Sequence, residues 1–349
     1  MKRFPLFLFI LPLALYSQTN ILNAKSPEEI GVSSVYDEVY APQNPFDYGF
    51  IDEKDVLFSK TIWEEINLDE RVNFPLYYPI DTLVVGNERR PLVHYLLTAA
   101  MQSDYPIYKK DNFKDLLSIE DLDKKQRYRI IRAGTDENIG LERIINEAGN
   151  KEDFLVQRGI DVGEYATMDE SLLNDDDYND YESRMEELIF ENNLLSEDEY
   201  SEEVFSYADV VKYRIRGVWY FDKRQSDLRY RPIAIAPVVV TPRSKAMMKE
   251  FSDPNMKPDY VELFWIFYPD ARFTLHNAKA FNNNNTSKPV TFDHLINSRH
   301  FSGYIYKQDN VYQDRSVKDY ISDNALMQLL ESQRIKEKIR NLEQDMWSY

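Results

Sequence analysis

Residues 211–240 read VKYRIRGVWYFDKRQSDLRYRPIAIAPVVV, the clearest secondary-structure pattern in the chain. Apolar residues alternate with basic ones in its first half, and a second apolar run, residues 228–240, follows the polar segment 222–227. Alternation is typical of a strand with one buried face, and two such runs around a short polar segment predict a β-hairpin. We therefore expect a long hairpin with one basic face.

More strands and a long helix are expected on the C-terminal side of this hairpin. Residues 261–268, VELFWIFY, are apolar at successive positions, which is typical of a strand buried on both faces. Residues 301–307 predict another strand. From residue 318 apolar residues recur at spacings of three and four, which predicts a helix over 318–349. Residues 204–317 thus form a β-rich region, followed by a terminal helix.

The N-terminal side of the hairpin has a helical pattern. Residues 91–102 have one apolar face and begin with Pro91, a residue favoured at helix starts. A charged helix is expected from Ser118, and a short amphipathic helix at 59–66 with Ser59 as its N-cap. The fold class is therefore α+β. It comprises a helical N-terminal region (56–160), an acidic connector (161–203) and a mixed, β-rich C-terminal half with a long terminal helix.

The first residues have the pattern of a secretory signal peptide. Lys2 and Arg3 precede an apolar run of about a dozen residues, shorter than the roughly 20 that a membrane-spanning helix needs. We expect a leader over 1–17, export of the chain, no direct membrane insertion, and an extended arm over 18–55. The absence of cysteine excludes disulfides and a lipid anchor on this chain.

The net charge of −18 excludes non-specific binding to nucleic acid or anionic lipid. The acid is concentrated in residues 161–203, which contain 17 acidic residues and one basic residue, Arg184. We interpret this segment as a linker or an interaction segment.

The predicted hairpin concentrates positive charge in this acidic chain. Its basic residues are Lys212, Arg214, Arg216, Lys223, Arg224, Arg229 and Arg231. One interpretation is a solvated strand face with ion pairs inside the chain. The other is a contact with the acidic segment of a second copy, repeated around a ring, with Trp219 as a buried anchor. The sequence leaves both open.

Signatures of catalysis are missing from the sequence. There is no nucleophile elbow, no zinc-protease helix, no phosphate-binding glycine loop and no cysteine nucleophile. The four histidines lack the i, i+4 spacing of metal ligands, and His94 fits a structural role. Acidic residues are so numerous that a close carboxylate pair carries no information. We expect no enzyme and no cofactor.

One acidic pattern resembles a calcium loop. Asp175, Asp177 and Asn179 occupy alternate positions and Glu186 falls at the twelfth, the oxygen-ligand spacing of an EF-hand. The sixth position is Asp180, where that loop needs glycine for its turn. The alternative is a solvated acidic linker.

Four phrases of the sequence resemble the GldN/PorN gliding-motility family. They are VLFSKTIW at 56–63, RVNFPLYYP at 71–79, ELFWIFYPDAR at 262–272 and YIYK at 304–307. The resemblance implies a periplasmic component of the type IX secretion system, without known catalytic residues. Its implied partners are a ring-forming outer-membrane lipoprotein, which would hold it at the outer membrane, a motor-linked periplasmic protein, and further copies of itself in a ring. Tyr36, Tyr40 and Phe46 of the arm are then candidate contacts to the lipoprotein.

The preferred function is thus a structural subunit of a periplasmic ring, required for protein export and gliding motility. Two alternatives from other classes stay open at this point. One is a periplasmic calcium-binding or hydrolytic protein, and the other is a regulatory adaptor that binds one partner without forming rings.

Overall fold

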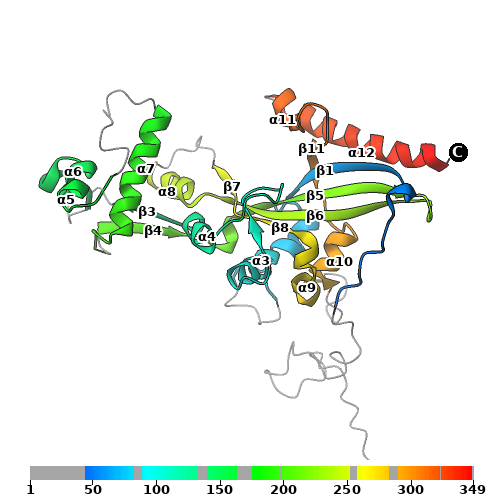
Figure 1. Cartoon of the computed structure of the whole chain (residues 1–349), viewed down its shortest axis with the longest axis horizontal. Helices are drawn as coiled ribbons and strands as arrows, with labels where there is room; N and C mark the ends of the chain where they lie inside the picture. The colour runs from blue at the N-terminus through cyan, green and yellow to red at the C-terminus, as the bar shows by residue number, and fades with distance from the viewer. Residues whose placement is uncertain are drawn as a thin grey trace, which may run out of the picture. The chain divides into compact units, whose positions relative to one another are not determined.

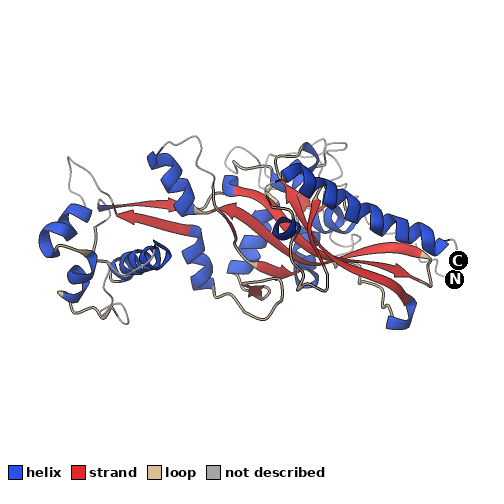
Figure 2. Ribbon diagram, turned by 90° about the horizontal axis from the view of Figure 1, so that it is seen from above, coloured by secondary structure: helices blue, strands red, loops and turns tan. Residues whose placement is uncertain are grey.

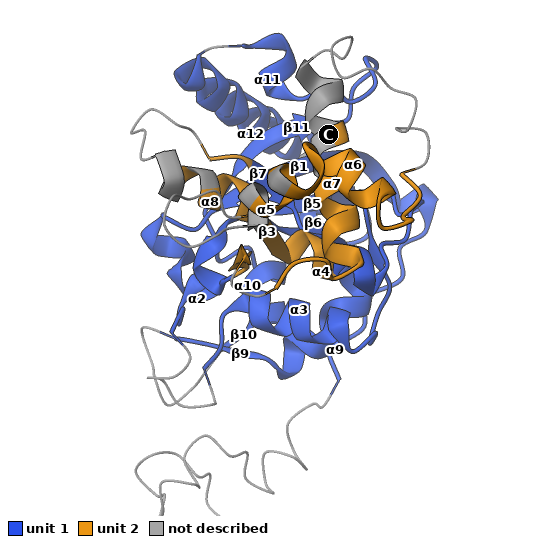
Figure 3. Cartoon of the chain, turned by 90° about the vertical axis from the view of Figure 1, so that its left-hand side faces the viewer, with its two compact units in different colours: residues 1–122, 206–240, 260–349 blue, residues 123–205, 241–259 orange. Residues whose placement is uncertain are grey.

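The computed structural model describes residues 44–81, 89–131, 140–162, 175–196, 199–251, 258–282, 290–322 and 324–347. The expected leader, Tyr36 and Tyr40 lie outside these residues. The chain divides into two compact units, drawn in separate colours in Figure 3. Unit 1 comprises residues 1–122, 206–240 and 260–349, and unit 2 comprises residues 123–205 and 241–259. Unit 2 is thus built from two insertions into the sequence of unit 1.

Unit 1 is built on an antiparallel sheet. Among the described residues it has seven strands, in the order β11-β1-β5-β6-β8-β2, with β7 paired to β6 beside that path. The strands are β1 (Val56–Asn67), β2 (Ile107–Tyr108), β5 (Val210–Asp222), β6 (Asp227–Val240), β7 (Tyr260–Glu262), β8 (Trp265–Phe267) and β11 (Tyr304–Gln308). Figure 1 shows β1, β5 and β6 running side by side as the longest strands.

The hairpin predicted from residues 211–240 is confirmed. β5 and β6 pair antiparallel along their lengths. The register shifts twice, between Val210 and Lys212 and between Arg216 and Gly217. Tyr213 and Ile215 are buried on one face, and Lys212, Arg214 and Arg216, which alternate with them, point to the other. The strand predicted at 301–307 is also confirmed, as β11.

The helix predicted at 59–66 is wrong, because these residues belong to β1. This strand pairs with β5 on one side and, from Ile62 to Glu65, with β11 on the other. Ile62, Trp63 and Ile66 are all buried, although Trp63 points to the opposite face from the other two. A strand covered on both faces has no clean alternation, so periodicity alone does not distinguish it from a helix.

The segment 261–268 is buried as predicted, but it is not one strand. β7 and β8 are separated by Leu263 and Phe264, which are fully buried, and Tyr268 begins a helix. The amide of Leu263 donates to the carbonyl of Pro237 in β6, 3.1 Å away, so the break stays attached to the sheet.

The helices of unit 1 lie in two places. α3, α9 and α10 gather near β6 and β8, while α12 packs against β11 (Figure 1). The helices are α2 (Phe74–Tyr77), α3 (Leu92–Met101), α9 (Tyr268–Asn277), α10 (Phe292–Asn297), α11 (Val317–Tyr320) and α12 (Ala325–Trp347). The helices predicted at 91–102 and at the C-terminus are confirmed, the latter with a break between α11 and α12. Two short strands, β9 (Lys279–Ala280) and β10 (Val290–Thr291), form a separate small sheet.

The chain passes from unit 1 to unit 2 within α4 (Ile119–Gln126), the helix predicted after Ser118. Among its described residues, unit 2 has one two-stranded antiparallel sheet and four further helices. They are β3 (Arg127–Ile131), β4 (Tyr200–Val204), α5 (Gly140–Ala148), α6 (Lys151–Val156), α7 (Asp175–Glu191) and α8 (Pro242–Phe251). Figure 2 shows the same elements from a second direction.

The acidic connector is folded where the structure describes it. α7 buries Tyr181, Met185 and Ile189 against Phe154 and Leu155 of α6. An open linker is therefore wrong for residues 175–191. The acidic composition hid this helix because its apolar residues recur only every fourth position, in a background of aspartate and glutamate.

Among the described helices, including the 23-residue α12, none combines the length and the apolar character that crossing a membrane requires.

One glycine of β5 allows an aromatic ring to lie flat on the sheet. A Cβ atom on Gly217 would overlap the ring of Tyr230 in β6, which packs against Trp219 at a centroid distance of 5.2 Å. Gly217→Ala should lower the free energy of unfolding by about 2 kcal/mol, because the ring that must move is packed against Trp219 and the Arg299 guanidinium. Chemical denaturation measures this. Gly49→Ala is the control, since its Cβ would meet nothing within 4 Å, and equal stabilities of the two variants would contradict the prediction.

Candidate functional site

Two consecutive carboxylates of β1 lie in the interior of unit 1. Glu64 and Glu65 are 0% and 3% exposed. Neighbouring residues of a strand point to opposite faces, so each needs its own counter-ion. A buried carboxylate without a partner would cost several kcal/mol.

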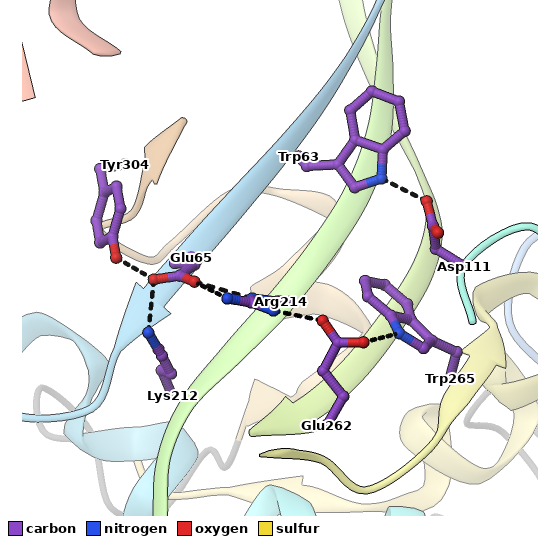
Figure 4. Close-up of polar contacts among 8 residues, drawn as sticks. All are labelled: Trp63, Glu65, Asp111, Lys212, Arg214, Glu262, Trp265 and Tyr304. Atoms are coloured by element: carbon purple, nitrogen blue, oxygen red, sulfur yellow. Dashed lines mark hydrogen bonds and ion pairs between the residues drawn. The ribbon is translucent and has the colours of Figure 1, made fainter. Parts of the chain in front are cut away.

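Glu65 is paired by the basic face of β5 (Figure 4). Its carboxylate accepts from Lys212 Nζ at 2.8 Å and from Arg214 Nε and Nη2 at 2.8 and 2.6 Å, and the Tyr304 hydroxyl also donates to it. Arg214 Nη1 donates to Glu262 at 2.5 Å. Lys212 and Arg214 are therefore partners of acidic residues within the same chain.

These contacts shift the acid–base properties of the pair. Burial would raise the pKa of Glu65, but the hydrogen bonds from Lys212 and Tyr304 and the charge of Arg214 hold it below its usual value of 4.5. The carboxylate of Glu65 in turn raises the pKa of Arg214, against the opposing effect of burial. Glu65 and Arg214 thus stabilise each other in their charged forms.

Two tryptophans also donate to carboxylates, and one of them, Trp265, is bonded to this network. Trp265 Nε1 donates to Glu262 at 2.6 Å, and Trp63 Nε1 donates to Asp111 at 2.6 Å (Figure 4). Arg216 lies over the Trp63 ring at 5.3 Å and donates to the backbone carbonyl of Asp111 at 2.8 Å. The third basic residue of β5 is therefore also held within the chain.

Glu64 has a separate partner. Arg299 donates to both of its carboxylate oxygens, at 2.7 and 2.8 Å. The guanidinium of Arg299 lies 4.9 Å from the Trp219 ring and 4.2 Å from the Tyr230 ring. Trp219, predicted as an anchor for a second copy, is half-buried and packs inside its own chain.

The described part of the N-terminal arm is anchored through Tyr48. Its hydroxyl donates to Asn297 at 2.7 Å, and its ring contacts the guanidinium groups of Arg231 and Arg272 at 4.6 and 4.1 Å. Burial raises the pKa of Tyr48 to about 12. Phe46, two residues earlier, is 79% exposed. It is thus available for the contact predicted from the sequence, which stays a prediction.

The predicted partner residues of the hairpin differ in how firmly they are held. Arg231 donates to the backbone of Gly49 in the arm. Arg229 pairs with Asp227 at 3.5 Å, and the side chains of this pair are about half exposed. The ion pairs inside the chain agree with the first of the two interpretations of the basic face. A contact with a second copy stays a prediction.

The calcium candidates lie on a helix. Asp175, Asp177 and Asn179 are in the first turns of α7, and Glu186 pairs with Lys151 at 2.8 Å. With 3.6 residues per turn, position 177 falls across the helix axis from positions 175 and 179. Among the described residues no group of three or more acidic or histidine side chains is arranged to hold a metal. Calcium binding stays a prediction.

Two further features of unit 1 are His94 and a hollow on the surface. His94 Nδ1 lies 2.8 Å from the Tyr207 hydroxyl, which fits the structural role expected for it. A shallow hollow of about 510 Å³ lies between α3 and α9, lined by Tyr95, Asp104, Tyr105, Asp270, Phe273, Thr274, Asn277 and Ala278. Its lining includes two aspartates, but no histidine, lysine or arginine that could activate a nucleophile beside them.

This arrangement defines a class of protein: an α+β scaffold in which buried carboxylates pair with basic residues of the same chain. The model of one protein family, described as gliding motility associated protein GldN, matches residues 51–348. The chain therefore belongs to the GldN family. Membership makes it a component of the gliding-motility and type IX secretion machinery, within a family of structural proteins that are not known as enzymes. Among curated proteins, none matches this chain.

Removing the charge of Glu65 tests the network. Glu65→Gln should lower the free energy of unfolding by about 3 kcal/mol at neutral pH, because Lys212 and Arg214 lose their shared counter-ion. The stabilisation by Glu65 is full above pH 4.5 and is lost as the pH falls through its lower folded-state pKa, so the difference should shrink in acid.

Urea unfolding followed by tryptophan fluorescence measures this difference at each pH. The control is Glu120→Gln, which removes an exposed carboxylate of α4. A difference between wild type and Glu65→Gln that is independent of pH would contradict the assignment.

Calorimetric titration of the full chain with calcium tests the acidic segment. The calcium hypothesis predicts a heat of binding at millimolar calcium, whereas the helical spacing of positions 175, 177 and 179 predicts none. A saturable heat that disappears in Asp177→Asn would establish a calcium site instead.

Proposed function

We propose that this protein is a structural subunit of the periplasmic ring of the type IX secretion system, required for protein export and gliding motility. It would act by binding and not by catalysis. Its partners would be an outer-membrane lipoprotein, through which it associates with the outer membrane, a motor-linked periplasmic protein, and further copies of itself. The observation that carries this proposal is the family match over residues 51–348.

The geometry supports a scaffold in two ways. First, Lys212 and Arg214 of β5 pair with Glu65 of β1, and Arg216 of β5 lies over the ring of Trp63 in β1. Polar contacts in a low-dielectric interior hold the two strands firmly together. Second, large apolar side chains remain exposed, including Phe46 and Phe50 at 79% and 82%. Exposed aromatic residues are typical anchors of protein interfaces.

The proposal of a lateral contact through the basic hairpin needs a different test from charge reversal at Arg214 and Arg216. Glutamate at position 214 would stand beside Glu65 and Glu262 and would unfold unit 1. Arg229 is the suitable position, because its exposed pair with Asp227 contributes little to stability.

The proposal is tested by purification of the protein from the native envelope in mild detergent, with negative-stain imaging of the eluate. We expect a large ring that contains a lipoprotein, and we expect Arg229→Glu to reduce ring recovery while its thermal unfolding matches wild type. Recovery of a one-to-one complex would favour the regulatory adaptor. A lone monomer that retains no envelope protein would contradict the scaffold.

A further inference from the structure

In the first two turns of α12, polar side chains face the body of unit 1 and apolar side chains face outward, the opposite of a usual amphipathic helix. Gln328 and Ser332 face the body of unit 1, where Gln328 donates to the carbonyl of Ile321 at 2.8 Å and Ser332 accepts from the amide of Ile305 at 2.7 Å. Leu326 and Leu330, on the outer side, are 67% and 48% exposed. Only later in the helix do apolar residues turn inward, at Ile335 and Ile339.

Polar contacts hold this segment of α12 in place. Ser332 satisfies a backbone amide of β11, the last strand of the sheet, so the helix closes that edge. Asn324 caps the helix by accepting from the amide of Met327 at 3.0 Å. The outward leucines are therefore fixed by the inner face, and the helix cannot turn to bury them.

Two tyrosines extend the exposed apolar surface beside the helix. Arg315 lies over the rings of Tyr312 and Tyr320 at 4.8 and 5.3 Å, and the Tyr320 hydroxyl donates to Glu331 of α12 at 3.3 Å. We define the α12 patch as the exposed residues Tyr312, Tyr320, Leu326, Met327, Leu329 and Leu330. Together they expose roughly 600 Å², the upper end of the range for the largest apolar patch on a monomer.

The charge around the α12 patch differs from that of the rest of the chain. Residues 311–340 contain six basic and five acidic residues, whereas the whole chain has a net charge of −18. Two copies repel each other over most of their surface, but not here. This region is therefore where a second copy can approach at the lowest electrostatic cost.

The leucine spacing matches a helix-to-helix contact. Leu326, Leu329 and Leu330 are related by i, i+3 and i+4, so they form one stripe of the helix. In a twofold contact the same stripe comes from each partner, and leucine meets leucine. Two α12 patches could bury at most roughly 1,200 Å² in total, which is the lower limit for a stable protein interface.

From these observations we infer that α12 is a dimerisation helix: the α12 patch of one copy packs against the α12 patch of a second copy, with the two helices antiparallel across a twofold axis. Figure 2 views the chain from the side of α12, where the helix lies in front of the strands. The inference names a contact for the self-association in the proposed function and rests on it to that extent, but the purified chain alone tests it.

Sedimentation velocity on the mature chain tests the inference. Wild type should sediment as a dimer at micromolar concentration, and Leu326→Gln with Leu330→Gln should weaken the dimer by about 100-fold, since both anchors are lost. Glutamine keeps the helix propensity, so the helix content by circular dichroism should not change. The matched control is Met101→Gln with Leu116→Gln, two exposed apolar residues outside the α12 patch, which should leave the dimer intact.

A single cysteine tests the twofold geometry independently. The chain has no cysteine, so Leu330→Cys introduces the only thiol. A residue near a twofold axis meets its own copy, and mild oxidation should therefore give a covalent dimer, whereas Leu116→Cys should give no covalent dimer under the same conditions.

Two results would overturn the inference. One is a wild-type chain that remains monomeric at the highest concentration tested, and the other is a dimer that the glutamine variant forms as well as wild type does. If wild type is monomeric and the glutamine variant loses an envelope protein in co-purification, the α12 patch binds a different partner and not a second copy. Recovery of a ring by a dimer-deficient variant would leave the proposed function intact.

Discussion

Glu64 and Glu65 stand side by side in the most buried part of β1, and unit 1 can fold only if both carboxylates find cationic partners. Arg299 reaches Glu64 from one face of the sheet, while Lys212 and Arg214 reach Glu65 from the other. Desolvation of one carboxylate costs several kcal/mol, which a hydrogen-bonded ion pair offsets only when its geometry is good. The pairing of β1 with β5 in one register supplies that geometry, since a shift by one residue would exchange the two faces.

This constraint determines how charge is distributed over the rest of the protein. The basic residues of β5 are held by acidic residues of the same chain, and the aromatic rings of Trp63, Trp219 and Tyr230 pack against guanidinium groups. Charge that is paired inside cannot also form an interface without breaking the network. Contacts with partners must therefore use other groups, and the exposed apolar residues of the arm and of α12 are the available ones.

A protein built in this way suits a role in a large assembly. The GldN family places the chain among structural components of a secretion machine, and a rigid sheet with apolar groups at its periphery can be held by several neighbours at once. The arm contributes through Tyr48, whose ring and hydroxyl fix an otherwise extended segment against α9 and α10. The charges of the sheet are paired within the chain, so the exposed apolar residues of the arm and of α12 remain for contacts with neighbours.

The spacing of apolar residues was enough to predict the β5–β6 hairpin, α3, α4, β11, the long terminal helix and the α+β class. This spacing, and the residues that favour turns and helix starts, can be recognised within short segments. Family membership could also be read from four short phrases. Two things required the tertiary structure. The first is that residues 59–66 form a strand, since burial on both faces removes the alternation that marks one. The second is where the basic face of β5 points, because its partners Glu65, Glu262 and Asp111 come from distant parts of the chain. Sequence alone determined which charges this protein carries, but only the pairing of strands far apart in sequence decided which of them meet.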